Sequence, residues 1–534
     1  MHLSSLCLGL LLATSSAIPN HGTPCRSIEE RKTMAISFLH DQLKHNPVPG
    51  YALSVVFQNH TIIAQGFGTK QHGNTSNIVT PDTLFQIGSY TKTFVALGIA
   101  KMVDEGRMQW SDTVKQHLPW FQLYDKFAEG YTTIADLLTM NSVLDAYQGD
   151  IVQSSFNVSE RQLVKNLVYL ETKRAIRSGY AYSNLNFIIL GQVLEFQSKK
   201  TWAEYLRQTF FVPLDMKNTY SRVEDVPLSG DLSFGHITCK GQVAGPCDLR
   251  TSIEIFSSPN NSYDASGSIL SSAADLSKFS RFLLSKGEGI FNSTKAIKDM
   301  ITGQIINNND AKNALSQGYE FSPDGGAYAA GYGFDIVGDV MFGHHFFDKG
   351  GDMLGFNLRN GFVPDEELAV VLLSNSESAG GPASDGLLQD RIRSYIVGIF
   401  LDVDENELKR SFNAAVKAST NSKKPESCPP HWFGGKSWND LGIPIPPTEQ
   451  TQLAGVYAAN ESTGYYGNIT VSVESNQLLM SYGIYKAPML RGKDEEGYIW
   501  TTEAAWNEMS FLEIDNSSAN STAIQLGEIS FVKL

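Results

Sequence analysis

Leu84-Phe-Gln-Ile-Gly-Ser-Tyr-Thr-Lys-Thr-Phe94 places a serine, Ser89, three residues before a lysine, Lys92. Residues three apart lie on one face of a helix, so Lys92 would stand one turn from Ser89 and could accept its hydroxyl proton. A Ser-x-x-Lys sequence alone more often marks a solvated helix face, so the surrounding sequence has to decide. The helical spacing of apolar residues predicts that the other side of this helix is buried in a core: Phe94, Val95, Ile99, Met102 and Val103.

Two further motifs follow in the chain. Gly179-Tyr-Ala-Tyr-Ser-Asn184 leads into the apolar helical pattern of residues 187–195, which predicts that Tyr182 and Asn184 lie on a loop before a buried helix. Phe347-Asp-Lys-Gly-Gly351 precedes a strand-like apolar run at residues 368–373. In this order, the three motifs resemble those of the serine β-lactamase and penicillin-binding-protein superfamily. The resemblance is closest to the class C, D-peptidase and esterase branch, where Tyr-x-Asn replaces Ser-Asp-Asn.

The resemblance extends over roughly the first three quarters of the chain. It implies an α+β fold in which an antiparallel sheet is flanked by helices and carries a helical insertion, with the catalytic domain over residues 26–417. Residues 51–58 and 61–68 independently predict a hairpin about Asn59 and His60. The segments that carry the wider resemblance are 101–112, 117–120, 133–139 and 265–275.

The composition changes near residue 418. Residues 418–448 are rich in Ser, Lys and Pro, which is typical of a linker. Residues 449–534 contain short strand-like runs separated by turns, and they resemble the lipocalin-like β-barrel that follows the catalytic domain in some members of the superfamily. We expect a barrel interior packed with side chains, and a role in packing or in shielding the substrate.

The resemblance implies a role for each motif residue. Ser89 would attack a carbonyl and form an acyl-enzyme, while Lys92 and Tyr182 share the work of the general base. Asn184 would orient Lys92 and the substrate. Lys349 would supply positive potential beside Tyr182 and could pair with a substrate carboxylate. The oxyanion hole would use the backbone N–H groups of Ser89 and of a residue after Lys349, for which we predict Asp352. His345, just before Lys349, is a further candidate for substrate contact.

Departures from the superfamily pattern bear on the substrate. Met140-Asn-Ser-Val-Leu144 stands where relatives often read His-Thr-Ser-Gly-Leu, and Lys349 is followed by Gly-Gly instead of Thr-Gly. The missing threonine hydroxyl removes a hydrogen bond to a substrate carboxylate. Esters, amides or small peptides are therefore more convincing substrates than β-lactams or D-Ala-D-Ala peptides. A Ser-His-Asp hydrolase is the rival enzyme class, but the chain has no Gly-x-Ser-x-Gly elbow.

The N-terminus and the composition indicate a compartment. The chain has 534 residues, of which 42% are hydrophobic and 18% charged, a globular balance large enough for at least two domains. Residues 1–17 combine a short apolar run with small residues, which predicts a secretory signal peptide cleaved after Ala17. No segment approaches the roughly 20 apolar residues of a membrane span. We therefore expect a secreted, extracellular protein.

Sequons and cysteines agree with that compartment. Four cysteine positions remain after removal of the signal, Cys25, Cys239, Cys247 and Cys428, and three pairings of them are possible. We expect Cys239 to bond Cys247 across a short loop and Cys25 to bond Cys428. No Cys-x-x-Cys or His-Glu-x-x-His spacing indicates zinc, so no metal and no cofactor are expected. Asn-x-Ser/Thr glycosylation sequons begin at Asn59, Asn74, Asn157, Asn260, Asn292, Asn460, Asn468, Asn516 and Asn520.

The net charge of -14 argues against nucleic acid or an anionic membrane as a partner. The first hypothesis is a secreted serine hydrolase that acts on a small acyl or peptide substrate. The alternative is an extracellular structural protein, of the kind found in the mollusc shell matrix, that keeps the fold and associates with matrix while its catalysis has become incidental. An acyl-enzyme would favour the first hypothesis, and association with mineral or insoluble matrix the second.

Overall fold

The fold was analysed in a computed structural model, which describes residues 25–156, 158–250, 264–307, 313–319, 328–381, 387–420, 427–493, 497–502, 511–518 and 521–534. The predicted signal peptide and the sequons at Asn157, Asn260 and Asn520 lie outside the described residues. The sequon residues Asn59, Asn74, Asn292, Asn460 and Asn468 are exposed.

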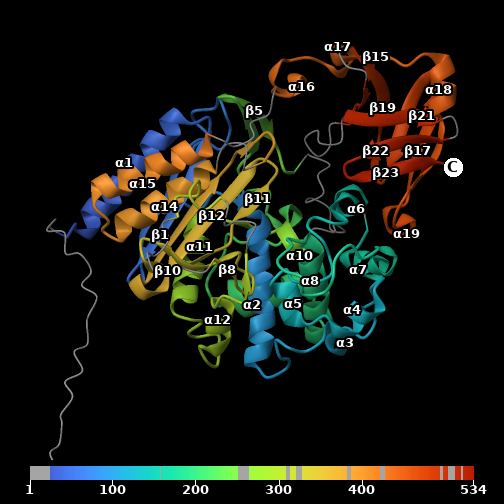
Figure 1. Cartoon of the computed structure of the whole chain (residues 1–534). Coiled ribbons are helices and arrows are strands. Elements are labelled where there is room, and N and C mark those ends of the chain that lie inside the picture. The colour runs from blue at the N-terminus through green and yellow to red at the C-terminus, as the bar shows by residue number, and fades with distance from the viewer. Residues whose placement is uncertain are drawn as a thin grey trace, which may run out of the picture.

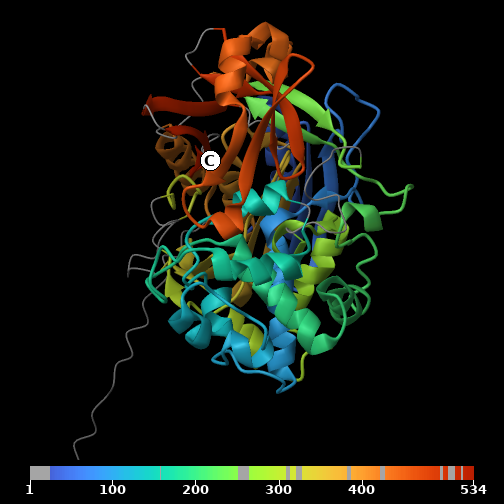
Figure 2. The same ribbon diagram turned by 90° about the vertical axis from the view of Figure 1, so that its right-hand side faces the viewer.

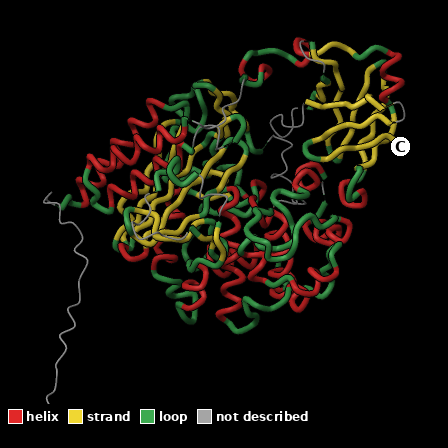
Figure 3. The backbone as a smooth tube through the Cα atoms, viewed as in Figure 1, coloured by secondary structure: helices red, strands yellow, loops and turns green. Residues whose placement is uncertain are grey.

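An antiparallel sheet forms the centre of the first domain (Figures 1 and 3). Its strand order is β2-β1-β13-β12-β10-β9-β8-β7, and β11 pairs with β12. The predicted hairpin is confirmed, because Phe57 pairs with His60 where β1 turns into β2. The strands are β1 (Gly50–Phe57), β2 (His60–Gly68), β7 (Ile305–Ile306), β8 (Ala329–Ala330), β9 (Ile336–Met341), β10 (His344–Asp348), β11 (Gly351–Met353), β12 (Phe356–Val363) and β13 (Leu368–Ser374).

Helices cover both faces of this sheet. On one face, α14 (Leu388–Phe400) packs on β12 and β13 and is covered in turn by α1 (Ile28–His45) and α15 (Glu405–Ser419). On the other face, α11 (Ala273–Leu284) packs on β1, β2 and β13. Every residue of β1 and β13 is buried. This explains why the two strands are continuous apolar runs without polar alternation.

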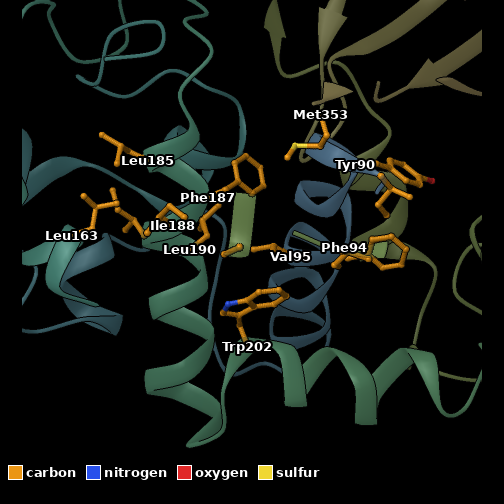
Figure 4. Packing of buried hydrophobic residues seen from close by; sticks show 14 of the residues in the cluster. Tyr90, Phe94, Val95, Leu163, Leu185, Phe187, Ile188, Leu190, Trp202 and Met353 are labelled. Carbon is orange, nitrogen blue, oxygen red and sulfur yellow. The ribbon is translucent and has the colours of Figure 1, made fainter. Parts of the chain in front are cut away.

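Two buried helices form the core of the helical part. α2 (Thr91–Asp104) follows Ser89, and α8 (Asn184–Ser198) packs against it, with Trp202 beside both (Figure 4). The apolar positions of α2 are buried as predicted, although Val103 is only partly so, but the opposite side is buried too, over Thr91–Met102. The side of α2 that carries Lys92 is therefore buried as well, which the sequence did not predict. Tertiary contacts on all sides of the helix explain the difference.

The helical insertion lies on the side of α2 and α8 away from the sheet (Figure 1). It is made of short helices, many of which begin at a Ser, Thr or Asp cap, such as Thr133 before α5 and Ser159 before α7. The helices are α3 (Val114–His117), α4 (Lys126–Tyr131), α5 (Ile134–Leu138), α6 (Asp150–Ser155), α7 (Glu160–Asn166), α9 (Trp202–Leu206) and α10 (Asp264–Gly267). α12 (Lys295–Met300) packs against α2 on the side of the sheet (Figure 1).

A small sheet carries the disulfide and corrects both predicted pairings. β4 (Gly235–Cys239) lies between β5 (Gln242–Cys247) and β14 (Glu377–Ser378), and Cys239 is bonded to Cys428. Cys247 pairs with Gly235, four residues from Cys239 along the hairpin. Four residues of strand span about 13 Å, too far for a disulfide. Cys25, predicted to bond Cys428, instead accepts a hydrogen bond from Arg31.

The C-terminal strands close an antiparallel barrel, as predicted (Figure 1). The strand order is β19-β18-β17-β16-β23-β22-β21-β20, and pairing of β20 with β19 closes the ring. Buried side chains such as Tyr457, Trp500 and Phe531 fill it. The strands are β16 (Gly455–Ala459), β17 (Asn468–Glu474), β18 (Gln477–Tyr482), β19 (Tyr485–Gly492), β20 (Tyr498–Trp500), β21 (Phe511–Ser518), β22 (Ser521–Leu526) and β23 (Ile529–Lys533).

The predicted linker contains regular structure. α16 (Pro430–Phe433) and α18 (Pro447–Leu453) each begin at a proline, where a missing N–H costs nothing. α17 (Trp438–Leu441) lies between them, and β15 (Gly442–Pro444) adds to the barrel edge at β19. With the bond from Cys428 to Cys239, this segment is attached to both domains.

The barrel also contacts the helical insertion directly (Figure 2). Ser462, before α19 (Thr463–Tyr466), accepts a hydrogen bond of 2.9 Å from the N–H of Glu171. The N–H of Ile484 donates to the carbonyl of Ser155, and the ring of Tyr482 packs edge-on against Phe156. These contacts place the barrel beside α6, and α6 begins next to the candidate active site.

Candidate active site

Ser89 lies on a tight turn before α2. The turn is the 3₁₀ segment η1 (Gly88–Tyr90), which follows β3 (Phe85–Gln86), and β3 pairs with β6 (Leu270–Ser271). Gly88 has a φ of +51°, and a Cβ at this position would lie 2.7 Å from the carbonyl oxygen of Asp352. Only glycine fits this approach. The serine is thus held between the start of α2 and strand β11.

The side chains of the three motifs meet at Ser89. Lys92 Nζ lies 3.0 Å from Ser89 Oγ, and the hydroxyl of Tyr182 lies 2.5 Å from the same oxygen. Lys349 Nζ lies 3.3 Å from the Tyr182 hydroxyl. The structure therefore brings the candidate nucleophile, the two candidate bases and the positively charged Lys349 into one hydrogen-bonded cluster. The chemical roles of these residues stay predictions.

The surroundings of Lys92 suit a neutral amine. Its side chain is 0% exposed, and Nζ donates to Asn184 Oδ1 and to the carbonyl of Ser266, both at 2.7 Å. A neutral amine has two N–H groups and one lone pair, so these two acceptors leave the lone pair for the hydroxyl of Ser89. Burial, and then the positive charge of Lys349, hold the pKa of Lys92 well below its usual value. Position and charge state both fit a general base.

Tyr182 fits the role of a proton donor. Burial, and then the charge of Asp335, raise the pKa of Tyr182 well above its usual value, so the resting phenol is neutral. Its hydroxyl can donate to Ser89 Oγ while it accepts from Lys349 Nζ. In this arrangement, Lys92 is placed to accept a proton and Tyr182 to donate one.

Lys349 is already paired. Its side chain is 2% exposed, and Nζ lies 2.5 Å from Asp335 Oδ2. The other oxygen of Asp335 accepts a hydrogen bond of 3.0 Å from Tyr180. A substrate carboxylate would have to compete with Asp335, so the predicted pairing of Lys349 with a carboxylate is not favoured by this arrangement. Its charge acts on Tyr182 and Lys92 instead.

Asn184 is the first residue of α8, which differs slightly from the predicted loop position. Its Oδ1 accepts from Lys92, and its Nδ2 donates to Asp150 Oδ2 at 2.8 Å. Asp150 and Asp335 were not found from the sequence, because each lies on a segment without a motif and reaches the site only through the fold. Tyr147, whose ring lies 5.5 Å from that of Tyr182, was missed for the same reason. Ser266 lies on segment 265–275, which carries part of the resemblance, but it contacts Lys92 through its backbone carbonyl, which no side-chain pattern marks.

Asp352 and His345 were predicted to contact the substrate, and both side chains pair with other residues of the chain. The side chain of Asp352 is turned away toward Arg359 at 2.8 Å, while its backbone adjoins the Ser89 turn, as the oxyanion-hole prediction requires. His345 is not part of the cluster. Its ring lies 3.2 Å from Asp339, and it stands four residues before Lys349 on a strand, a span of about 13 Å.

Within the described ranges, no group of three or more His, Cys, Asp or Glu side chains is arranged to hold a metal ion. In the same part of the chain, no helix has the length and apolar character needed to cross a membrane.

The fold and this cluster agree with the comparison to known families. The family model described as Beta-lactamase matches residues 35–392, and the chain belongs to this family. This places the chain in a superfamily of hydrolases.

Individual relatives are more distant. The chain is 25% identical to "Unguisins hydrolase ungD'" of Aspergillus campestris, over 81% of this chain and 76% of that protein. It is 24% identical to "Protein flp" of Staphylococcus aureus, over 64% and 62%.

Two solved structures are similar in fold. The octameric penicillin-binding protein homologue from Pyrococcus abyssi has a TM-score of 0.56 at 20% identity, over 94% of this chain and 99% of that one. The D-amino acid amidase from Ochrobactrum anthropi has a TM-score of 0.52 at 20% identity, over 73% and 99%.

Proposed function

We propose that the protein is a secreted serine hydrolase that cleaves esters, amides or small peptides through an acyl-enzyme on Ser89. The observation that carries the proposal is the geometry of Lys92. Two acceptors occupy its N–H groups and leave its lone pair for the Ser89 hydroxyl, 3.0 Å away. An unactivated serine is a poor nucleophile, so a buried neutral amine in this position supplies the missing base.

In the acylation step, Ser89 Oγ forms a bond to the substrate carbonyl carbon while its proton passes to Lys92. The backbone N–H groups of Ser89 and Asp352 are our candidates to stabilise the resulting oxyanion. The tetrahedral intermediate collapses and the bond to the leaving group breaks. Tyr182 gives its proton to the leaving oxygen or nitrogen, and Lys349 stabilises the phenolate until the Lys92 ammonium returns a proton.

The deacylation step uses the same groups in the same roles. A water molecule attacks the acyl carbonyl carbon while the neutral Lys92 accepts its proton. Tyr182 gives its proton to Ser89 Oγ as the ester bond breaks, and the Lys92 ammonium then returns a proton to the Tyr182 phenolate. No cofactor is needed for this sequence. The hydroxyl of the water stays on the acyl group, and its proton reaches Ser89 Oγ through the residues of the cluster.

Tyr147 favours an aromatic or apolar acyl group. Its residue surface is 62% exposed, its ring lies beside that of Tyr182, and its backbone N–H donates to the Tyr182 carbonyl at 2.9 Å. Its φ of +55° is uncommon for a bulky residue, which indicates that the fold holds the ring there. The names of two similar proteins, an unguisins hydrolase and a D-amino acid amidase, make amides a sensible first substrate class.

Secretion is part of the proposal. The bond between Cys239 and Cys428 and the exposed asparagines of several sequons support it, since disulfides persist and N-glycans are added along the secretory route. A mass loss on deglycosylation of the protein recovered from culture medium would agree with this compartment.

The test of the activity is a comparison of native protein and Ser89→Ala on matched acetyl and phenylacetyl esters and amides. We expect turnover that Ser89→Ala abolishes and that favours the phenylacetyl group. Turnover unchanged in Ser89→Ala would contradict the proposal. A folded native protein without any turnover would favour the matrix alternative, which retention on insoluble matrix would then test.

A further inference from the structure

Asp150 is a half-buried residue whose carboxyl group the reaction described above does not use. It is the first residue of α6, and its Oδ2 accepts the hydrogen bond from Asn184 Nδ2 at 2.8 Å. Its other oxygen, Oδ1, is buried and has no hydrogen-bond partner within the part of the chain that the structure describes. A buried acceptor without a partner is costly, so its retention calls for a reason.

The hydrogen bonds through Asn184 connect Asp150 to the base. An amide can turn either its oxygen or its nitrogen toward Lys92. Because a carboxylate only accepts hydrogen bonds, Asp150 fixes the nitrogen of Asn184 on its own side and the oxygen on the side of Lys92. That orientation provides one of the two acceptors that aim the lone pair of Lys92 at Ser89.

The barrel holds Asp150 in place. The residue before it, Gly149, has a φ of +86°, and its carbonyl accepts a hydrogen bond of 3.4 Å from the hydroxyl of Tyr465 on α19. A Cβ on Gly149 would lie 2.7 Å from that hydroxyl oxygen. The far end of α6 is bound by Ile484 of the barrel through the carbonyl of Ser155. Both ends of α6 are therefore fixed from the barrel.

We infer that Asp150 is a positioning residue for Lys92, that it acts through Asn184, and that the barrel serves catalysis by holding α6 in place. This inference rests on the proposed hydrolase function. It gives the second domain a role that the sequence leaves open between packing and shielding.

The negative charge of the Asp150 carboxylate makes the inference testable. Burial raises the pKa of Asp150 to about 7, against the opposing effects of the Asn184 hydrogen bond and of Lys92. The charged groups that face Lys92 are Lys349, Asp335 and Asp150. The tyrosines whose pKa values respond to Asp150 are Tyr147 and Tyr182 of the catalytic domain and Tyr465 and Tyr466 of the barrel.

The sign of the effect follows from these charges. An ionised Asp150 favours the ammonium form of Lys92. Above about pH 7, where Asp150 carries its charge, removing that charge therefore lowers the pKa of Lys92 further. A charge roughly 7 Å away, across one amide group, shifts a pKa by about one to two units at an effective dielectric constant of about 20. The acidic limb of the pH–rate profile, where Lys92 becomes protonated, should therefore move to lower pH over the range in which Asp150 is ionised, by up to about one to two units.

The experiment measures the labelling rate of Ser89 by a fluorophosphonate against pH in native protein, Asp150→Asn, Asp150→Ala and the control Asp145→Asn, which lies five residues earlier in the segment that leads into α6. We expect Asp150→Asn to keep the plateau rate within several-fold and to shift the acidic limb downward. Asp150→Ala should also lose plateau rate, at least tenfold, because Asn184 is no longer held. Asp145→Asn should leave the limb in place.

An acidic limb of Asp150→Asn within about 0.3 pH units of the native one would overturn the inference, since the expected shift is larger. A shift of the acidic limb in Asp145→Asn equal to that in Asp150→Asn would also overturn the inference. If Asp150→Asn does not fold, Asp150→Ser removes the same charge and carries the same expectation. Native protein without labelling would refute the proposed function, and the inference with it, whereas labelled native protein with an unshifted variant refutes the inference alone.

Discussion

Tyr182→Phe separates the chemistry of the site from its stability. The change removes one hydroxyl group, which lies 2.5 Å from Ser89 Oγ and 3.3 Å from Lys349 Nζ. Lys349 keeps its pairing with Asp335, so no buried charge loses its only partner. The expected loss of folding stability is therefore small, about 1 kcal/mol.

The expected loss of activity is much larger. A positioned general acid contributes about 10² to 10⁴ in rate, which corresponds to about 3 to 5 kcal/mol of transition-state stabilisation. We expect kcat to fall by that factor, with KM changed little, because the phenol acts on the leaving group. Amides should suffer more than activated esters, whose leaving groups need no proton.

The assay compares kcat for an amide and for an activated ester in native protein, Tyr182→Phe and Tyr180→Phe. Tyr180→Phe is a matched control, because it removes the same group two residues away, where the hydroxyl contacts Asp335 and not Ser89. We expect less than a tenfold loss in the control. A folded Tyr182→Phe protein with amide turnover within about threefold of native would refute the assignment of the acid.

Two further changes have predicted outcomes. Replacing both Cys239 and Cys428 with serine opens a bond across 189 residues, which lowers the free energy of unfolding by up to about 5 kcal/mol. The measurement is guanidinium unfolding, and a midpoint equal to that of the oxidised native protein would contradict it. Lys349→Met removes the positive charge that lowers the pKa of Lys92, so the acidic limb of kcat/KM should move to higher pH, opposite to Asp150→Asn. A pH profile of Lys349→Met whose acidic limb lies at the native pH or lower would show that the charge of Lys349 does not affect the pKa of Lys92.

The sequence predicts the parts of the site whose signals are local. Ser89 and Lys92 are one helical turn apart, and Tyr182 and Asn184 immediately precede or begin an apolar helix. The resemblance of these motifs to those of the superfamily then assigns them to one site. The hairpin of β1 and β2 and the strands of the barrel are likewise visible as short alternating or apolar runs between turns. Each of these predictions depends on residues that are neighbours in the chain.

Features set by distant contacts could not be predicted in this way. Asp335, just before β9, and Asp150, at the start of α6, reach the cluster from segments far apart in sequence, and nothing in their neighbours marks them. The disulfide joins Cys239 to Cys428 because the hairpin geometry separates Cys239 from Cys247, which spacing in the sequence conceals. The burial of α2 on every side depends on the helices packed around it, including α8 and α12.

The most direct test of the account is the intact mass of the native protein after exposure to a fluorophosphonate and, separately, to a generic thioester. We predict one adduct per chain from each reagent, mapped to Ser89 and lost in Ser89→Ala. The reason is that the Ser89 hydroxyl lies within 3.0 Å of the Lys92 amine that would accept its proton. Folded native protein that carries no adduct, or an adduct that persists in Ser89→Ala, would contradict the assignment of Ser89 as the acyl-enzyme serine.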